Sequence, residues 1–225
     1  MDPFTEYSPF IIYRCATGSR AYGLDVEGSD TDLRGIYLPP AARHWSLAGV
    51  PEQIEDKENE EIYWELQKFL RLALKGNPTV LECLYTPIVL DISPLGEELL
   101  AMRSIFLSRM IYQTYNGYAI EQFRKFERQR ASGTIRWKHA MHLIRLLLSG
   151  IAALRDGEIP VRVGEHRERL LSIRHGAMEW DEVDEWRRTL HNEFERAYAR
   201  TTLPELPDHP RADAFLIRTR RAMVG

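Results

Sequence analysis

Apolar residues in the first third of the chain follow the two-residue period of β-strands. Residues 10–13 form a β-rich apolar run that ends at a turn-rich stretch. A second run over residues 33–38 leads into Pro39 and Pro40, which cannot continue a strand inside a sheet. A third run over residues 60–64 passes directly into a helical pattern. The first third is therefore predicted to form a small mixed sheet.

From residue 65 onward, apolar residues recur at intervals of three and four, which is the period of an amphipathic helix. The first such stripe runs from Leu66 to Leu74, and Gly76 ends it. The predicted fold class is α+β, with a small mixed-sheet head over residues 1–90 and an α-helical body over residues 91–225. The further predicted helices cover residues 79–85, 94–103, 107–131, 136–155, 165–175, 181–200 and 210–223.

Composition places the chain among folded globular proteins. Hydrophobic residues make up 44% and charged residues 28% of the 225 residues, which excludes a disordered chain. No apolar run approaches the ~18 residues of a membrane helix, and the first residues lack the features of a secretory signal. Cys15 and Cys83 are too few for a disulfide framework and lack the spacing of zinc ligands. We therefore expect a cytoplasmic protein with no membrane partner.

The net charge of −3 is unevenly distributed along the chain. Residues 1–65 carry 13 acidic and 5 basic side chains, whereas residues 103–145 carry 9 basic and 2 acidic ones. One interpretation is an acidic metal site that faces a platform for a polyanion. The other is two solvated faces of opposite sign, and composition alone favours it. Specific motifs are needed to decide between them.

One segment combines a turn suited to phosphate with paired carboxylates. Gly18 lets the backbone approach an anion, the Ser19 hydroxyl adds a donor, and Arg20 adds positive charge. Asp30 and Asp32 open the next strand, where residues i and i+2 point to the same face. Like charges this close repel, and a hard divalent cation relieves the repulsion through oxygen ligands. Metal-assisted nucleotidyl transfer requires these parts; the alternative is a surface turn with two acidic residues.

Gly18-Ser19 followed by Asp30-x-Asp32 resembles the signature of the DNA polymerase β-like nucleotidyltransferase superfamily. The fuller match is to the predicted nucleotidyltransferases associated with RNA ligases in RNA-repair operons, and it spans residues 10–160. The resemblance implies a mixed sheet of at most five strands flanked by helices. It also implies two-metal chemistry with Mg²⁺ or Mn²⁺ on a nucleoside triphosphate. The blocks that carry the similarity are residues 18–23, 29–35, 68–82 and 138–146.

The resemblance implies a third metal-binding carboxylate on a neighbouring strand, just before the first long helix. The superfamily has aspartate at this position, whereas this chain has Glu60, or Glu61 if the strand is shifted by one residue. Glutamate is longer but offers the same oxygen donors. The expected catalytic and metal-binding set is therefore Asp30, Asp32 and Glu60. The alternative for the glutamates is a charged loop, because further acidic residues precede them.

Three basic side chains fall on one face of the helix predicted over residues 136–155. The head has few basic residues, so the charge of a triphosphate must be offset from elsewhere. We expect a cleft between head and body, with Asp30 and Asp32 on one wall and this helix face on the other. The alternative is a solvated face. The expected nucleotide-binding residues are Gly18, Ser19, Arg20, Lys138, His142 and Arg145.

Two further features leave alternatives open. Glu82 lies among apolar neighbours, and a carboxylate in such surroundings needs a partner or a function. We favour an ion pair with an arginine of the helical body. A basic run from Arg124 to Arg130 is either a solvated face or a contact for an RNA backbone. The solvated face is the more common situation for such runs.

The combined prediction is a metal-dependent nucleotidyltransferase. It transfers a nucleoside monophosphate from a nucleoside triphosphate to an acceptor hydroxyl, with an RNA end as the preferred acceptor and an RNA ligase of the same pathway as a possible partner. One alternative keeps the fold but modifies a protein or a small molecule. Another is a catalytically inactive module that binds nucleotide or RNA, supported by glutamate in place of the third aspartate.

Overall fold

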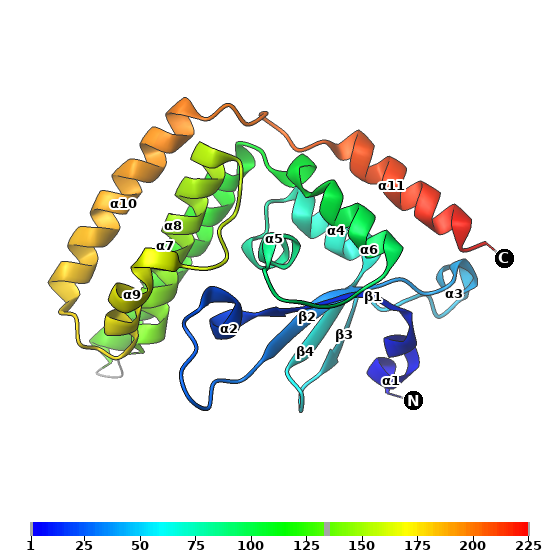
Figure 1. Cartoon of the computed structure of the whole chain (residues 1–225), viewed down its shortest axis with the longest axis horizontal. Helices are drawn as coiled ribbons and strands as arrows, with labels where there is room; N and C mark the ends of the chain where they lie inside the picture. The colour runs from blue at the N-terminus through cyan, green and yellow to red at the C-terminus, as the bar shows by residue number, and fades with distance from the viewer. Residues whose placement is uncertain (1, 133–135, 225) are drawn as a thin grey trace.

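A mixed sheet forms the N-terminal part of the protein (Figure 1). The computed structural model describes residues 2–132 and 136–224. Within these residues, five strands lie in the order β3-β4-β2-β1-β5. Helices make up the C-terminal part, so the predicted α+β class is confirmed. The strands are β1 (Ile11–Thr17), β2 (Asp32–Tyr37), β3 (Gln53–Asp56), β4 (Glu61–Glu65) and β5 (Val89–Ile92).

The direction of the strands determines which chain ends meet. β1 pairs antiparallel with β2 and with β5, and β3 pairs antiparallel with β4. β2 and β4 pair in parallel, with Leu33 opposite Glu61. Consequently the C-terminal end of β1 and the N-terminal ends of β2 and β4 lie at the same edge of the sheet.

Helices before, between and after the strands complete the fold. Two short helices, α1 (Pro3–Tyr7) and η1 (Ser8–Phe10), precede the sheet, and α2 (Gly18–Tyr22) and α3 (Ala41–Trp45) interrupt it. Asn77 caps α5 by accepting a hydrogen bond from the Val80 N–H, so the predicted helix stop also starts the next helix. The remaining helices are α4 (Leu66–Leu74), α5 (Pro78–Tyr85), α6 (Pro94–Ala101), η2 (Arg103–Phe106), α7 (Met110–Ala131), α8 (Trp137–Asp156), η3 (Gly164–His166), α9 (Arg167–Arg174), α10 (Trp180–Arg200) and α11 (His209–Ala222).

Alternating side chains give the sheet two apolar faces. Ile36 and Trp64 join the main core, which continues under α4 and α5 and into the α7–α8–α10 bundle. Tyr37 and Tyr63 point the other way and join a smaller cluster under α1. None of the helices in the described residues combines the length and apolar character that a membrane span requires.

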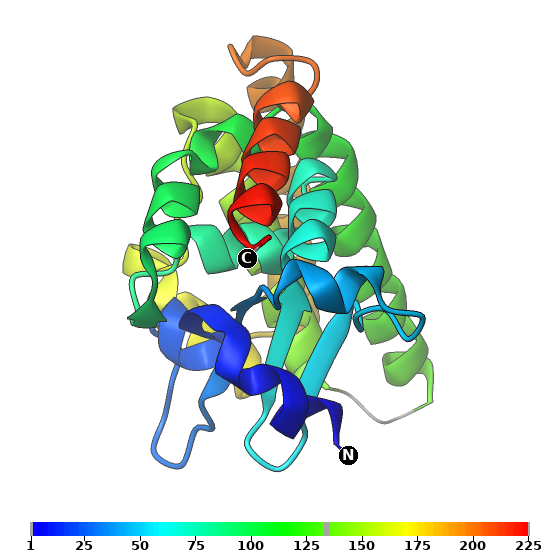
Figure 2. The ribbon, with the colours of Figure 1, turned by 90° about the vertical axis from the view of Figure 1, so that its right-hand side faces the viewer.

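The last helix returns to the head. Figures 1 and 2 show α11 beside α4, above the sheet, and the two helices are in contact. Arg220 donates a 2.9 Å hydrogen bond to Glu65, which also caps the N-terminus of α4. The boundary expected at residue 90 falls inside β5. The division into head and body remains a prediction.

Candidate active site

The two ends of the motif over residues 18–32 meet at the sheet edge described above. Thr17, the last residue of β1, pairs with Asp32, the first residue of β2. Gly18 and Ser19 therefore begin α2 directly beside the Asp30–Asp32 segment. The Leu33 N–H donates to the Glu60 carbonyl at 3.2 Å, which places Glu60 next to Asp32 on the neighbouring strand. Topology thus gathers parts that are 42 residues apart in sequence.

Gly18 approaches Asp32 more closely than any other residue type could. Its φ is +68°, which disfavours a side chain, and a Cβ on it would lie 2.0 Å from Asp32 Oδ2. The carboxylate therefore rests against the turn itself. Asp32 is half-buried and lies 3.4 Å from Arg34 Nη2, whereas Asp30 is exposed.

Glu60 and Glu61, the two candidates for the third carboxylate, occupy different environments. Glu60 is exposed and has a φ of 55°, an uncommon conformation for a non-glycine residue. Arg34 donates a 2.7 Å hydrogen bond to its carbonyl and holds the backbone there. Glu61 is buried, pairs with Arg14 and accepts a hydrogen bond from the Tyr63 hydroxyl. Of the two, Glu60 faces the cavity, and a strained backbone is a common feature of functional sites.

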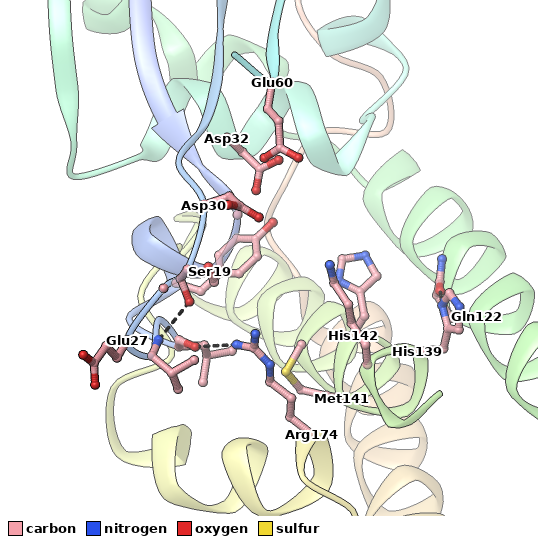
Figure 3. A pocket seen from close by; sticks show the side chains of 17 residues that line it. Ser19, Glu27, Asp30, Asp32, Glu60, Gln122, His139, Met141, His142 and Arg174 are labelled. Atoms are coloured by element: carbon pink, nitrogen blue, oxygen red, sulfur yellow. Dashed lines mark hydrogen bonds between the residues drawn. The ribbon is translucent and has the colours of Figure 1, made fainter. Parts of the chain in front are cut away.

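A cavity of about 510 Å³ opens in front of these carboxylates. That volume lies within the range of ligand-binding clefts. Figure 3 shows the Asp30, Asp32 and Glu60 carboxylates on one side and the α8 side chains across from them. The residues that line it are Gly18, Ser19, Tyr22, Leu24, Val26, Glu27, Gly28, Ser29, Asp30, Asp32, Glu60, Gln122, Lys138, His139, Met141, His142 and Arg174.

The wall opposite the carboxylates is basic and comes from the helical body. Lys138 and His142 lie one turn apart on α8, and Arg174 ends α9. Lys138 and Arg174 make no ion pair within the described residues. Nearby, His139 Nδ1 lies 2.9 Å from Gln122 Oε1 of α7. The cavity thus joins acidic groups at the sheet edge with basic groups of α8 and α9.

Three arginines hold the loop that carries Asp30. Arg20 donates to the Ser29 carbonyl at 2.7 Å and to the Asp30 carbonyl at 3.3 Å. From α9, Arg167 donates to the Gly23 carbonyl at 2.8 Å and Arg174 to the Leu24 carbonyl at 2.7 Å. The guanidinium of Arg20 is therefore engaged with the backbone, and Arg20 is not among the residues that line the cavity.

Arg145 also lies outside the cavity lining. Its side chain is only 3% exposed and forms an ion pair with the equally buried Glu82. The expected ion pair of Glu82 with a body arginine is therefore confirmed. Arg145 follows Lys138 by seven residues, about 10 Å along a helix, and this step carries it from the cavity into the core. The expectation that Arg145 contacts nucleotide is not met by this geometry.

The carboxylates fit the chemistry of a divalent cation without forming an assembled site. Asp30, Asp32 and Glu60 offer only hard oxygen donors, which Mg²⁺ and Mn²⁺ prefer. In residues 2–132 and 136–224, no three His, Cys, Asp or Glu side chains are grouped closely enough to hold a metal ion.

Comparison with known families identifies the chain. The sequence profile described as RlaP, the RNA repair pathway DNA polymerase beta family, matches residues 4–218. The chain belongs to this family. The resemblance inferred from the motifs is thereby confirmed, and the match extends well beyond residues 10–160.

Three curated proteins are similar to parts of the chain. YcgL of Bacillus subtilis is 38% identical over 87 residues, which cover 37% of this chain and 34% of YcgL. A 38.9 kDa protein of Enterobacteria phage T4 is 30% identical over 125 residues, which cover 48% of this chain and 36% of the phage protein. MJ0002 of Methanocaldococcus jannaschii is 24% identical over 164 residues, which cover 70% of this chain and 65% of MJ0002. The chain spans about a third of the length of the first two.

Several cavity residues were not identified from sequence. Arg174 ends a predicted helix, but a single arginine at a helix end carries no motif. Tyr22 belongs to the recognised segment, yet nothing in the sequence gave it a role. Gln122 comes from α7, and only the packing of α7 against α8 brings it to the cavity. Long-range packing brings these residues to the cavity, and the local sequence pattern cannot predict such packing.

Proposed function

We propose that this protein transfers a nucleoside monophosphate from a nucleoside triphosphate to an acceptor hydroxyl. The observation that carries the proposal is the cavity itself. It places Asp30, Asp32 and Glu60 on one wall and the basic groups of Lys138 and Arg174 on the other. Membership in a DNA polymerase beta family supports the same reaction class.

Each group of cavity residues has a separate role in this proposal. The turn at Gly18, with the Ser19 hydroxyl, receives the phosphates. Lys138 and Arg174 offset the charge of the triphosphate from the opposite wall. Asp30, Asp32 and Glu60 would hold Mg²⁺ or Mn²⁺, which supplies charge neutralisation and orientation at the phosphate when bound.

In the reaction, the acceptor oxygen attacks the α-phosphorus and forms a new phosphodiester bond. The bond from the α-phosphorus to the bridging β-oxygen breaks, and pyrophosphate leaves. The hydroxyl proton passes to a carboxylate of the acidic wall. Positioning the two reactants in one cavity accounts for a large part of the acceleration in such reactions.

Labelled nucleotide transfer tests this function. The protein is incubated with each labelled nucleoside triphosphate, Mg²⁺ or Mn²⁺, and RNA ends. We expect wild type to label an acceptor and the Asp30→Asn, Asp32→Asn double variant to lose the activity. Glu27→Gln is the matched control, because Glu27 is an exposed carboxylate at the rim of the same cavity. Equal labelling by wild type and the double variant would overturn the assignment.

An RNA end is the proposed acceptor. Gln122 of α7 lines the cavity, and the exposed Arg124 and Arg128 continue along the same helix. Neither arginine makes an ion pair within the described residues. Two such cations one turn apart, on the helix that also carries Gln122, suit a phosphate backbone. The family description, which places its members in RNA repair, supports this choice.

RNA binding separates this acceptor from a protein or a small molecule. Arg124→Ala with Arg128→Ala should weaken RNA binding and reduce its dependence on salt concentration. Arg196→Ala with Arg200→Ala is the control, because these exposed arginines have the same spacing on α10. Equal RNA affinity in both double variants would contradict the RNA assignment while leaving nucleotidyl transfer open.

A further inference from the structure

The ion pair that removes Arg145 from the cavity is part of a larger buried network. Arg145 of α8 and Glu82 of α5 are each 3% exposed. The second carboxylate oxygen of Glu82 accepts a 2.7 Å hydrogen bond from the Tyr22 hydroxyl. The guanidinium of Arg145 also stacks on the Tyr22 ring, 3.8 Å from its centroid. The network joins helices of the sheet region to α8 of the bundle.

His142 ends this network at the cavity wall. Arg145 Nη2 lies 3.1 Å from His142 Nδ1, and His142 lines the cavity. A guanidinium has five donors and no acceptor. The hydrogen bond therefore exists only when His142 Nδ1 carries no proton. A neutral imidazole without a proton on Nδ1 carries its proton on Nε2. The Nε2–H group of His142 can therefore donate a hydrogen bond to another molecule.

The surroundings keep this imidazole neutral. Burial, followed by the adjacent Arg145 guanidinium, lowers the pKa of His142 to about 3. His139 and Lys138 on the same helix and Lys125 of α7 act in the same direction. Asp30, Asp32 and Glu60 lie on the opposite wall, and Arg174 adds a cation from α9.

We propose that Arg145 and Glu82 are positioning residues that hold His142 as a neutral Nε2–H donor toward an acceptor atom of the bound nucleotide. The tautomer lock follows from the network alone, whereas the identity of the ligand rests on the proposed function. Glu82 holds the Arg145 guanidinium, and Arg145 donates a hydrogen bond to Nδ1 of His142. The imidazole therefore keeps Nδ1 as its acceptor and Nε2 as its donor. The recognised atom is thus an acceptor, either a phosphate oxygen or an acceptor on the base.

The tautomer can be observed directly by NMR in the full-length protein. In ¹⁵N-histidine-labelled protein, long-range ¹H–¹⁵N correlations distinguish protonated from unprotonated ring nitrogens. We expect His142 to show a proton on Nε2 only, unchanged from pH 5 to pH 8. A proton on Nδ1, or titration of His142 inside this range, would refute the lock whether or not the protein is an enzyme.

Replacing the pair tests its positioning role. Arg145→Met alone leaves Glu82 buried without a cation beside it, so the informative variant is Arg145→Met with Glu82→Leu, in which an apolar pair replaces the ionic one. We expect this double variant to populate both tautomers of His142 and to raise its pKa. Arg155→Met is the control on the same helix, because Arg155 is exposed and pairs only with Asp156. An unchanged His142 spectrum in the double variant overturns the proposal.

Binding measurements then identify the acceptor atom. His142→Phe keeps a ring of similar size but removes the donor, and we expect it to weaken nucleotide binding about tenfold. A matching loss for inorganic triphosphate assigns the contact to phosphate, and a loss confined to nucleosides assigns it to the base. Unchanged affinity for every ligand overturns the donor role. A locked His142 in a protein that binds nucleotide but transfers none contradicts the proposed function instead.

Discussion

Gly18→Ala tests whether the turn determines the position of the Asp32 carboxylate, which we propose as a metal ligand. The added Cβ would lie 2.0 Å from Asp32 Oδ2, whereas ordinary contacts begin at about 3.4 Å, so the two atoms must separate by about 1.4 Å. A displacement of this size in a reacting group costs about a hundredfold in rate. The positive φ at Gly18 adds a backbone cost of about 1–2 kcal/mol for a residue with a side chain.

The control separates the two effects. Gly157 has a φ of +69°, nearly the same as Gly18, but a Cβ there meets nothing within 4 Å. Both alanine variants should lose about 2–8 °C in Tm by differential scanning calorimetry. Only Gly18→Ala should lose labelled transfer about a hundredfold. Transfer at the wild-type rate by Gly18→Ala would show that the position of Asp32 against the turn is irrelevant to the reaction.

Three further outcomes are expected. Arg145→Met should lower the free energy of unfolding by about 3–5 kcal/mol in urea titrations, because Glu82 stays buried without a cation beside it. Adding Glu82→Leu should recover most of that loss, and a full loss in the double variant contradicts this. Glu60→Gln should reduce transfer at unchanged Tm, whereas Glu61→Gln should lower Tm and largely retain transfer; the reverse assigns the metal role to Glu61. The folded-state pKa of His142, about 3, is below the ordinary value of 6.5, so between these pH values the unfolded chain binds a proton that the folded chain does not. The contribution of His142 to the free energy of unfolding is therefore fully present above pH 6.5. It decreases as the pH falls toward 3. Between pH 6 and pH 4 the loss should be about 1.4 kcal/mol per pH unit and should be absent in His142→Phe, as urea titrations at each pH will show.

Helices and the acidic motif could be predicted from sequence because both depend on local pattern. The predicted helix over residues 136–155 matches α8, Trp137–Asp156, within one residue at each end. The strand period was only partly right for the paired aspartates, because β2 begins at Asp32 and Asp30 lies in the loop before it. β3 was not predicted, because Ile54 is its one buried residue and the other residues of the strand are polar. Edge strands with solvated side chains carry little periodic signal.

The third carboxylate and Arg145 show where sequence reasoning ends. Choosing between Glu60 and Glu61 requires the register of β4 against β2, which is a long-range property. Helical spacing correctly placed Arg145 on the stripe of Lys138 and His142. It could not show that this stripe enters the core after two turns, where a charge persists only with a partner such as Glu82.

The arginine contacts to the loop beside Asp30 determine which loop residues can be substituted during evolution. The hydrogen bonds to this loop from Arg20, Arg167 and Arg174 are all donated to main-chain carbonyl oxygens. Every amino acid has such a carbonyl group. Residues 25–27 in the held loop are exposed, and two of them form part of the cavity rim. Their side chains can therefore be exchanged without loosening the backbone that carries Asp30. Randomising residues 25–27 would therefore change the surface of the cavity rim while leaving the backbone contacts of Arg20, Arg167 and Arg174 in place.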